Sequence, residues 1–158
     1  MGYGGITLFT SFFVHASFGH LLGNLYFLLA FGNNVEDRVG HGRFALLLVL
    51  ATLAGNILHI AFDPRPDIPL IGASGGISGI VLFYALAFPN ARIYMMVYFR
   101  VFSVPAWAFA VIWLLWQFAV VMAQISGFSG VSALAHLGGA MAGLGCWLLW
   151  RRERQNFH

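Results

Sequence analysis

The chain has 158 residues, of which 60% are hydrophobic and only 8% are charged, and its mean hydropathy is +0.83. Soluble domains carry about 25% charged residues, so this composition indicates an integral membrane protein and excludes an ordinary soluble enzyme. The net charge of +3 comes from Arg residues beside apolar stretches, which indicates membrane topology and no nucleic-acid-binding patch. The single cysteine, Cys146, excludes a disulfide framework and is expected to be a small core residue.

Five apolar stretches follow one another along the chain, at approximately Leu8–Phe31, Phe44–Phe62, Ile77–Phe88, Val101–Ile125 and Val131–Trp150. Four of them have the ~20 residues that a spanning helix needs. The third is too short unless its helix begins inside the bilayer, and such a start is tolerated only where it lines a cavity or is buried in protein. The sequence therefore predicts an all-α polytopic membrane helix bundle of about five transmembrane helices over residues 1–150, with a basic cytoplasmic tail over residues 151–158.

The arginines predict the orientation of this bundle. Seven of the eight lie between the first and second stretches, between the third and fourth, or after the fifth. The opposite side holds only Arg65 and the neutral Ser126–Gly130 connection. Because Arg is enriched on the cytoplasmic side, we expect the C-terminus in the cytoplasm and the N-terminus outside. The Met1–Thr10 segment has no basic region, so no signal peptide is expected.

All carboxylates are expected in loops or in the tail, namely Glu36, Asp37, Asp63, Asp67 and Glu153. Without a carboxylate pair inside the predicted spans, an aspartyl mechanism is excluded. A proton-coupled transporter with a carboxylate relay is disfavoured for the same reason. The zinc-protease pattern His-Glu-x-x-His is absent as well, which disfavours a zinc protease.

Several polar side chains within the apolar stretches are costly in a bilayer and therefore indicate a functional site. His20 and Asn24 are four residues apart and are expected on one face of the first helix, with His15 about one turn earlier. Ser74 stands at the mouth of the third stretch, and His136 stands at the start of the fifth. A lone helical histidine is more often a packing residue, but the set as a whole favours catalysis.

Ser74 has the surroundings that a serine nucleophile needs. At a helix N-terminus, free backbone N–H groups and the helix dipole stabilise a developing oxyanion. The glycines of the Gly72–Gly75 segment allow a sharp entry into the helix and close approach of a substrate. His136, as a neutral imidazole, is expected to act as general base, and His20 and Asn24 are suitable oxyanion donors. No Asp is placed to orient the histidine, so a two-residue Ser-His arrangement is implied.

Other polar residues in the spans favour structural roles. The Gly-x-Ser-Gly pattern is weak evidence by itself, because such runs also pack helices and Gly76–Gly79 repeats it. Ser78 in the second copy lies one turn deeper in the helix, away from its free amides, so Ser74 is the better nucleophile. Asn56 and His59 are expected to form hydrogen bonds between helices.

Small residues predict close packing of the third and fifth apolar segments. Gly139 and Gly143 are four residues apart, and so are Gly75 and Gly79. This spacing lets two helix backbones approach closely in a membrane. Such an approach would bring the predicted nucleophile and base within hydrogen-bond reach.

Together these residues resemble the rhomboid family of intramembrane serine proteases. The similar segments are His15–Asn24, Phe31–Gly40, Gly72–Gly75, Phe88–Arg92, Pro105–Trp107 and Ala135–Gly143. Taken in that order, the first two are similar to the family's His-x-x-x-Asn segment with its upstream His and to the turn that follows it. The third is similar to the nucleophile motif, the fourth and fifth to segments of a bacterial or archaeal branch, and the sixth to the last catalytic helix. The similarity runs in order over nearly the whole chain.

The resemblance implies a serine endopeptidase that hydrolyses peptide bonds in or near transmembrane segments. Ser74 would be the nucleophile, His136 the general base, and His20, Asn24 and the Ser74 amide the oxyanion hole. The supporting residues would be His15, Gly72, Gly75, Gly139 and Gly143. It further implies no metal or cofactor, single-pass membrane proteins as substrates within the lipid bilayer, no nucleic-acid partner, and a prokaryotic plasma membrane as location.

Two departures from the family pattern stand out. The chain begins where the family's second span normally starts, so the first helix and the outer loop with its Trp-Arg pair are expected to be missing. Many members carry an aromatic residue one turn after the nucleophile, packed on the catalytic histidine. Here that position is Ser78, and Tyr84 is farther along.

Two alternatives to a protease remain. A non-catalytic rhomboid-like protein that binds transmembrane helices would be marked by loss of the serine or the histidine, and both are present. A small transporter or channel with water access lined by histidines would need charged intramembrane residues or repeat symmetry, which the sequence lacks.

Overall fold

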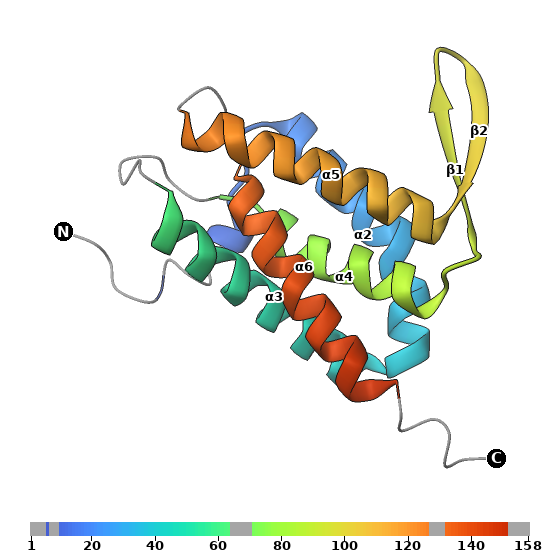
Figure 1. Cartoon of the computed structure of the whole chain (residues 1–158). Coiled ribbons are helices and arrows are strands. Elements are labelled where there is room, and N and C mark those ends of the chain that lie inside the picture. Colours follow the sequence, from blue (N-terminus) through green and yellow to red (C-terminus); the bar gives the residue numbers. More distant parts are fainter. Residues whose placement is uncertain (1–5, 7–9, 64–70, 127–131, 152–158) are drawn as a thin grey trace.

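The computed structural model describes residues 6, 10–63, 71–126 and 132–151, so Arg65, Asp67 and the predicted tail beyond Arg151 lie outside the described residues. The elements are η1 (Ser11–Phe13), α2 (Phe18–Val39), α3 (His41–Phe62), α4 (Ser74–Ala87), β1 (Arg92–Val97), β2 (Arg100–Pro105), α5 (Ala106–Ile125) and α6 (Ala133–Trp150). Figure 1 shows the five α-helices packed as one bundle, with the β-hairpin projecting from one end. Each apolar stretch thus contributes one helix, and the predicted helical membrane fold is confirmed.

The helices differ in how they relate to a bilayer. Among the described residues, α3, α5 and α6 are long and apolar enough to cross a membrane. The apolar helix α4 has 14 residues, which at ~1.5 Å per residue is about 21 Å, less than the ~30 Å of a hydrocarbon core. The last turns of α2 contain Glu36, Asp37 and Arg38. The prediction that Glu36 and Asp37 lie in a loop is therefore wrong, because α2 continues past its apolar part.

Helix α4 is the centre of the bundle. Ten of its fourteen residues are buried, and Figure 1 shows it enclosed by the other helices. A helix that is apolar on all sides suits either a protein core or a membrane span, and α4 is too short to span. Its glycines meet α6 backbone to backbone: a Cβ on Gly139 would collide with the Gly75 carbonyl, and one on Gly143 with the Gly79 carbonyl. The predicted close packing of the third and fifth apolar segments is confirmed.

The first long helix begins and ends later than the sequence predicts. Ser17 caps α2, because its hydroxyl accepts a hydrogen bond from the His20 N–H at 3.1 Å. The chain stays helical through Val39, and the break falls at Gly40, which has a φ of +84°. A turn over Phe31–Gly40 is therefore wrong. Phe31 and Val35, one helical turn apart, are both buried, and this burial holds the segment in α2.

A β-hairpin that the sequence analysis does not predict joins α4 to α5. Strands β1 and β2 pair antiparallel, with Val97 opposite Arg100. The two turn residues, Tyr98 and Phe99, have φ values of 45° and 62°, as a tight two-residue hairpin turn requires. The apolar stretch at Val101–Ile125 is thus divided between strand β2 and helix α5.

Candidate active site

Ser74 is the first residue of α4, and the backbone in front of it is held in an unusual conformation. Gly72 has a φ of +104°, a region that favours glycine. Its N–H donates to the Ser11 carbonyl oxygen at 2.8 Å, which ties the entry of α4 to η1. Ala73 occupies the N-cap position and offers no side-chain cap. Because the first amides of a helix have no acceptor within the helix, Ser74 stands beside free donors.

His20 and Asn24 lie against this entry from α2. A Cβ built on Gly72 would lie 2.9 Å from His20 Nε2 and 3.5 Å from Asn24 Nδ2, so both side chains touch the backbone two residues before Ser74. Asn24 is 9% exposed, and its Nδ2 has no hydrogen-bond partner among the described residues. An unpaired buried donor is costly. Such a donor is expected where a substrate oxygen is to be bound.

His15 lies next to this pair but outside the helix. The sequence analysis expects His15 one turn earlier on the same helical face, but His15 precedes the Ser17 cap and is not part of α2. Its ring contacts that of His20 edge to face, with 5.1 Å between the centroids. The contact gives His15 a supporting position beside His20.

His136 lies in the first turn of α6. Ser132 caps this helix by accepting from the Ala135 N–H at 3.1 Å. The Nδ1 of His136 lies 2.8 Å from the side-chain oxygen of Gln117 on α5. Trp113, one turn before Gln117, lies beside the same imidazole, with 6.5 Å between ring centroids. His136 is therefore held by side chains of α5.

The starts of α4 and α6 face each other at the site. A Cβ on Gly75 would lie 3.3 Å from the Ala135 carbonyl oxygen, so the residue after Ser74 touches the residue before His136. Among the described residues no hydrogen bond joins Ser74 to His136, and the dyad stays a prediction. Hydrogen bonds of this kind are often long in the absence of substrate and tighten when it binds.

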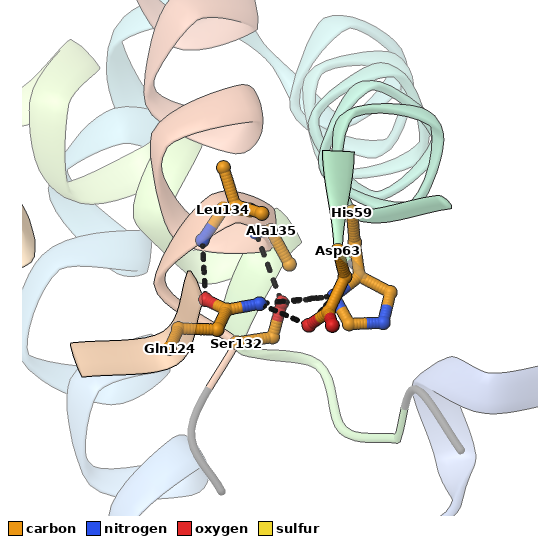
Figure 2. A network of polar contacts seen from close by, with 6 residues as sticks. All are labelled: His59, Asp63, Gln124, Ser132, Leu134 and Ala135. Atoms are coloured by element: carbon orange, nitrogen blue, oxygen red, sulfur yellow. Dashed lines mark hydrogen bonds and ion pairs between the residues drawn. The ribbon is translucent and has the colours of Figure 1, made fainter. Parts of the chain in front are cut away.

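Figure 2 shows a second polar cluster, where side chains from the ends of α3 and α5 meet the start of α6. Gln124 of α5 donates to Asp63 and accepts from the Leu134 N–H at 3.2 Å. His59 Nδ1 lies 2.8 Å from the Ser132 hydroxyl, so the predicted helix-to-helix hydrogen bond of His59 is confirmed. Asp63 follows the last residue of α3, so its predicted position outside the helix is confirmed, although its side chain is only 2% exposed. The cluster joins α3, α5 and α6 beside the candidate site.

The remaining structural predictions for polar and small residues agree with the packing. Asn56 donates to the Ser11 hydroxyl at 3.2 Å, joining α3 to η1. Ser78 is buried and donates to the Ser74 carbonyl at 2.6 Å, as expected of a helix-interior serine. Cys146 is buried in the core.

Sequence reasoning missed Gln117 and Trp113. The signal was nevertheless present, because Gln117 and Gln124 are the two amide side chains of the otherwise apolar helix α5. They are seven residues apart and so share one face, which is the buried face of that helix. A membrane-embedded amide needs a partner on another element.

These features define an integral membrane helical bundle with a candidate serine site at one end. The sequence matches the rhomboid domain over residues 4–153, and the chain belongs to the rhomboid family. It is 30% identical to RHOMBOID-like protein 12, mitochondrial, of Arabidopsis thaliana, over 96% of this chain and 48% of that protein. It is 29% identical to Rhomboid protein 1, mitochondrial, of Saccharomyces cerevisiae, over 88% of this chain and 40% of that protein.

A bacterial relative carries an enzymatic name. Putative rhomboid protease YdcA of Bacillus subtilis is 32% identical over 86% of this chain and 62% of its own length. The chain spans less than half the length of the two mitochondrial relatives. The family is therefore established by sequence, while the activity of this chain is a separate question.

Proposed function

We propose that this chain is an intramembrane serine endopeptidase that hydrolyses peptide bonds in or near transmembrane segments. Ser74 acts as nucleophile and His136 as general base and acid. His20, Asn24 and the Ser74 backbone amide form the oxyanion hole. The observation that carries the proposal is the unpaired, buried Asn24 amide, which lies beside His20 at the glycine entry to α4.

The proposed reaction follows from these positions. The Ser74 hydroxyl oxygen attacks the scissile carbonyl carbon, and its proton passes to His136 Nε2. The carbonyl oxygen becomes an oxyanion, which accepts hydrogen bonds from Asn24, His20 and the amide at the start of α4. The C–N bond then breaks, the imidazolium gives its proton to the leaving amine, and water hydrolyses the acyl-enzyme by the reverse proton path.

The proposed substrates are single-pass membrane proteins that reach the site from the lipid bilayer. A substrate helix has all its backbone groups paired, so it must unwind before a carbonyl meets Ser74. Small or helix-destabilising residues at the cleavage point are therefore favoured. The asymmetry of the arginines supports a cytoplasmic C-terminus, and hence cleavage near the opposite face. The proposed location is a prokaryotic plasma membrane.

Labelling with a fluorophosphonate probe tests the proposal, because the probe reacts only with an activated serine. The detergent-solubilised chain is compared with Ser74→Ala and His136→Ala, and Ser78→Ala is the matched control one turn deeper in α4. We expect labelling of the wild type and the control, and none of the first two variants. Labelling that persists in Ser74→Ala would refute the assigned nucleophile.

Cleavage of a single-pass membrane protein in liposomes extends the test to the natural type of bond. The same variants should show the same order of rates. A wild-type chain that binds such a helix but neither cleaves it nor reacts with the probe would favour the alternative, a non-catalytic rhomboid-like binding protein.

A further inference from the structure

The side chain of Gln117 makes a specific contact with the candidate base. Its Oε1 lies 2.8 Å from His136 Nδ1, and Gln117 is only 5% exposed. An amide oxygen accepts hydrogen bonds and cannot donate them, so Nδ1 must carry the proton. A neutral imidazole has a single N–H, so its Nε2 then carries a lone pair.

The surroundings of His136 hold the ring for this purpose. Trp113 and Gln117 are one turn apart on α5, so they approach the imidazole from one side of the same helix. The Trp113 and His136 rings are inclined by 35° and lie 6.5 Å apart. Trp113 thus lies beside the imidazole, while Gln117 fixes which nitrogen is protonated.

We propose that Gln117 is a positioning residue that keeps His136 in the Nδ1-protonated tautomer and so leaves Nε2 ready to accept the Ser74 proton. This inference rests on the proposed protease function. When Nε2 takes that proton, the ring becomes an imidazolium, and its Nδ1–H still donates to the Gln117 carbonyl. The carbonyl dipole points its negative end at the new charge, and it stabilises that charge during the reaction.

A neutral amide suits this position better than a carboxylate would. In soluble serine proteases an aspartate holds the histidine tautomer. A carboxylate buried within a membrane bundle is far more costly, because it must stay ionised without water. Gln117 supplies the same acceptor geometry without a permanent charge. The two-residue Ser-His arrangement implied by the sequence thus becomes a three-residue Ser-His-Gln arrangement.

The test separates this role from packing by comparing Gln117→Met with Gln117→Glu. Methionine keeps the length of the side chain and loses the oxygen acceptor, whereas glutamate keeps an acceptor oxygen at the same position. For fluorophosphonate labelling, we expect kinact to fall about 10- to 100-fold in Gln117→Met with KI unchanged, because the buried Nδ1–H loses its partner. Gln117→Glu should recover part of the rate, because it restores the acceptor oxygen but adds the cost of a buried carboxylate. Wild-type kinact in Gln117→Met would overturn the proposal.

A tautomer measurement tests the same inference without relying on activity. The 15N chemical shifts of labelled histidine, assigned by difference from His136→Ala, report which ring nitrogen is protonated. We expect a protonated Nδ1 in the wild type and a shift toward a protonated Nε2 in Gln117→Met. The same substitution at Gln124 is the control and should leave the His136 signal unchanged. A protonated Nε2 in the wild type would overturn the proposal.

The two measurements also distinguish the ways of failing. A chain that shows the expected tautomer but does not react with the probe retains the Gln117 contact and refutes the protease assignment. A chain that reacts with the probe but shows no dependence on Gln117 retains the protease assignment and refutes the positioning role.

Discussion

Replacing Gly55 by alanine tests whether the close approach of α3 and α6 sets the position of the candidate base. A Cβ on Gly55 would lie 2.5 Å from the Ala135 carbonyl oxygen, whereas ordinary contact begins at 3.4 Å. The two helices must therefore separate by about 0.9 Å. Ala135 directly precedes His136 and also contacts Gly75, so the displacement changes the position of the imidazole relative to the start of α4.

The magnitude has two parts. Overpacking of a closely packed contact costs about 1–3 kcal/mol, and the better helix propensity of alanine offsets about 0.5–1 kcal/mol of this. The variant should therefore lose up to about 2.5 kcal/mol of stability. A misplacement of ~1 Å at a reacting group costs about 100-fold in rate. The labelling rate should therefore fall by more than the loss of stability alone would cause.

The assay compares Gly55→Ala with Gly42→Ala, which changes the same helix where no atom lies within 4 Å of the added Cβ. Unfolding midpoints in detergent and fluorophosphonate labelling rates are measured for both. Gly42→Ala should match or exceed the wild-type midpoint and keep its rate. Equal midpoints and rates in the two variants would refute the reasoning, because they would show that the contact of α3 with α6 at Ala135 accommodates an added Cβ.

Three further predictions address the oxyanion hole, the entry to α4 and the second polar cluster. Asn24→Ala should lower kcat by about 100- to 1000-fold with little change in KM, since it removes one oxyanion donor; an unchanged kcat would exclude Asn24 from that role. Gly72→Ala should lower both the unfolding midpoint and the labelling rate, because the φ of +104° disfavours a side chain and the new Cβ would press on His20. The control is Gly23→Ala, because the space around its Cβ is open. Gln124→Leu should lower stability by about 1–3 kcal/mol in a denaturant titration, because it removes the acceptor of the buried Leu134 N–H and one hydrogen bond of Asp63 (Figure 2). A wild-type midpoint would contradict this.

The number and order of the helices could be predicted because a helix within a bilayer requires a long run of apolar residues. The ends of the helices could not, because the apolar run does not mark them. In α2 the helix outlasts its apolar part, since Phe31 and Val35 continue one buried face toward a glycine stop at Gly40. In the hairpin, the apolar residues of β2 run directly into those of α5, so the length of the apolar run does not separate the strand from the helix.

The residues of the candidate site also differ in whether the sequence predicts their positions. His20 and Asn24 were predictable as a pair because helical spacing places them on one face, and both touch Gly72. Ser74 was predictable because flanking glycines mark a close backbone approach. The Gln117 contact was not, because it joins residues 19 apart on two helices and depends on how α5 and α6 cross. Spacing along one helix carries no information about that crossing.

A physical constraint connects the parts of this site. The side chains around the candidate nucleophile are uncharged at rest: Ser74, Asn24, Gln117 and the neutral imidazole of His136. In the proposed reaction, charge exists only between proton transfer and collapse of the oxyanion. Each transient charge is stabilised by a dipolar group that is already in position. Amide donors and the start of α4 face the oxyanion, and the Gln117 carbonyl faces the imidazolium. The bilayer penalises permanent buried charge, so a membrane protease gains from groups that are dipolar at rest and respond only when charge appears.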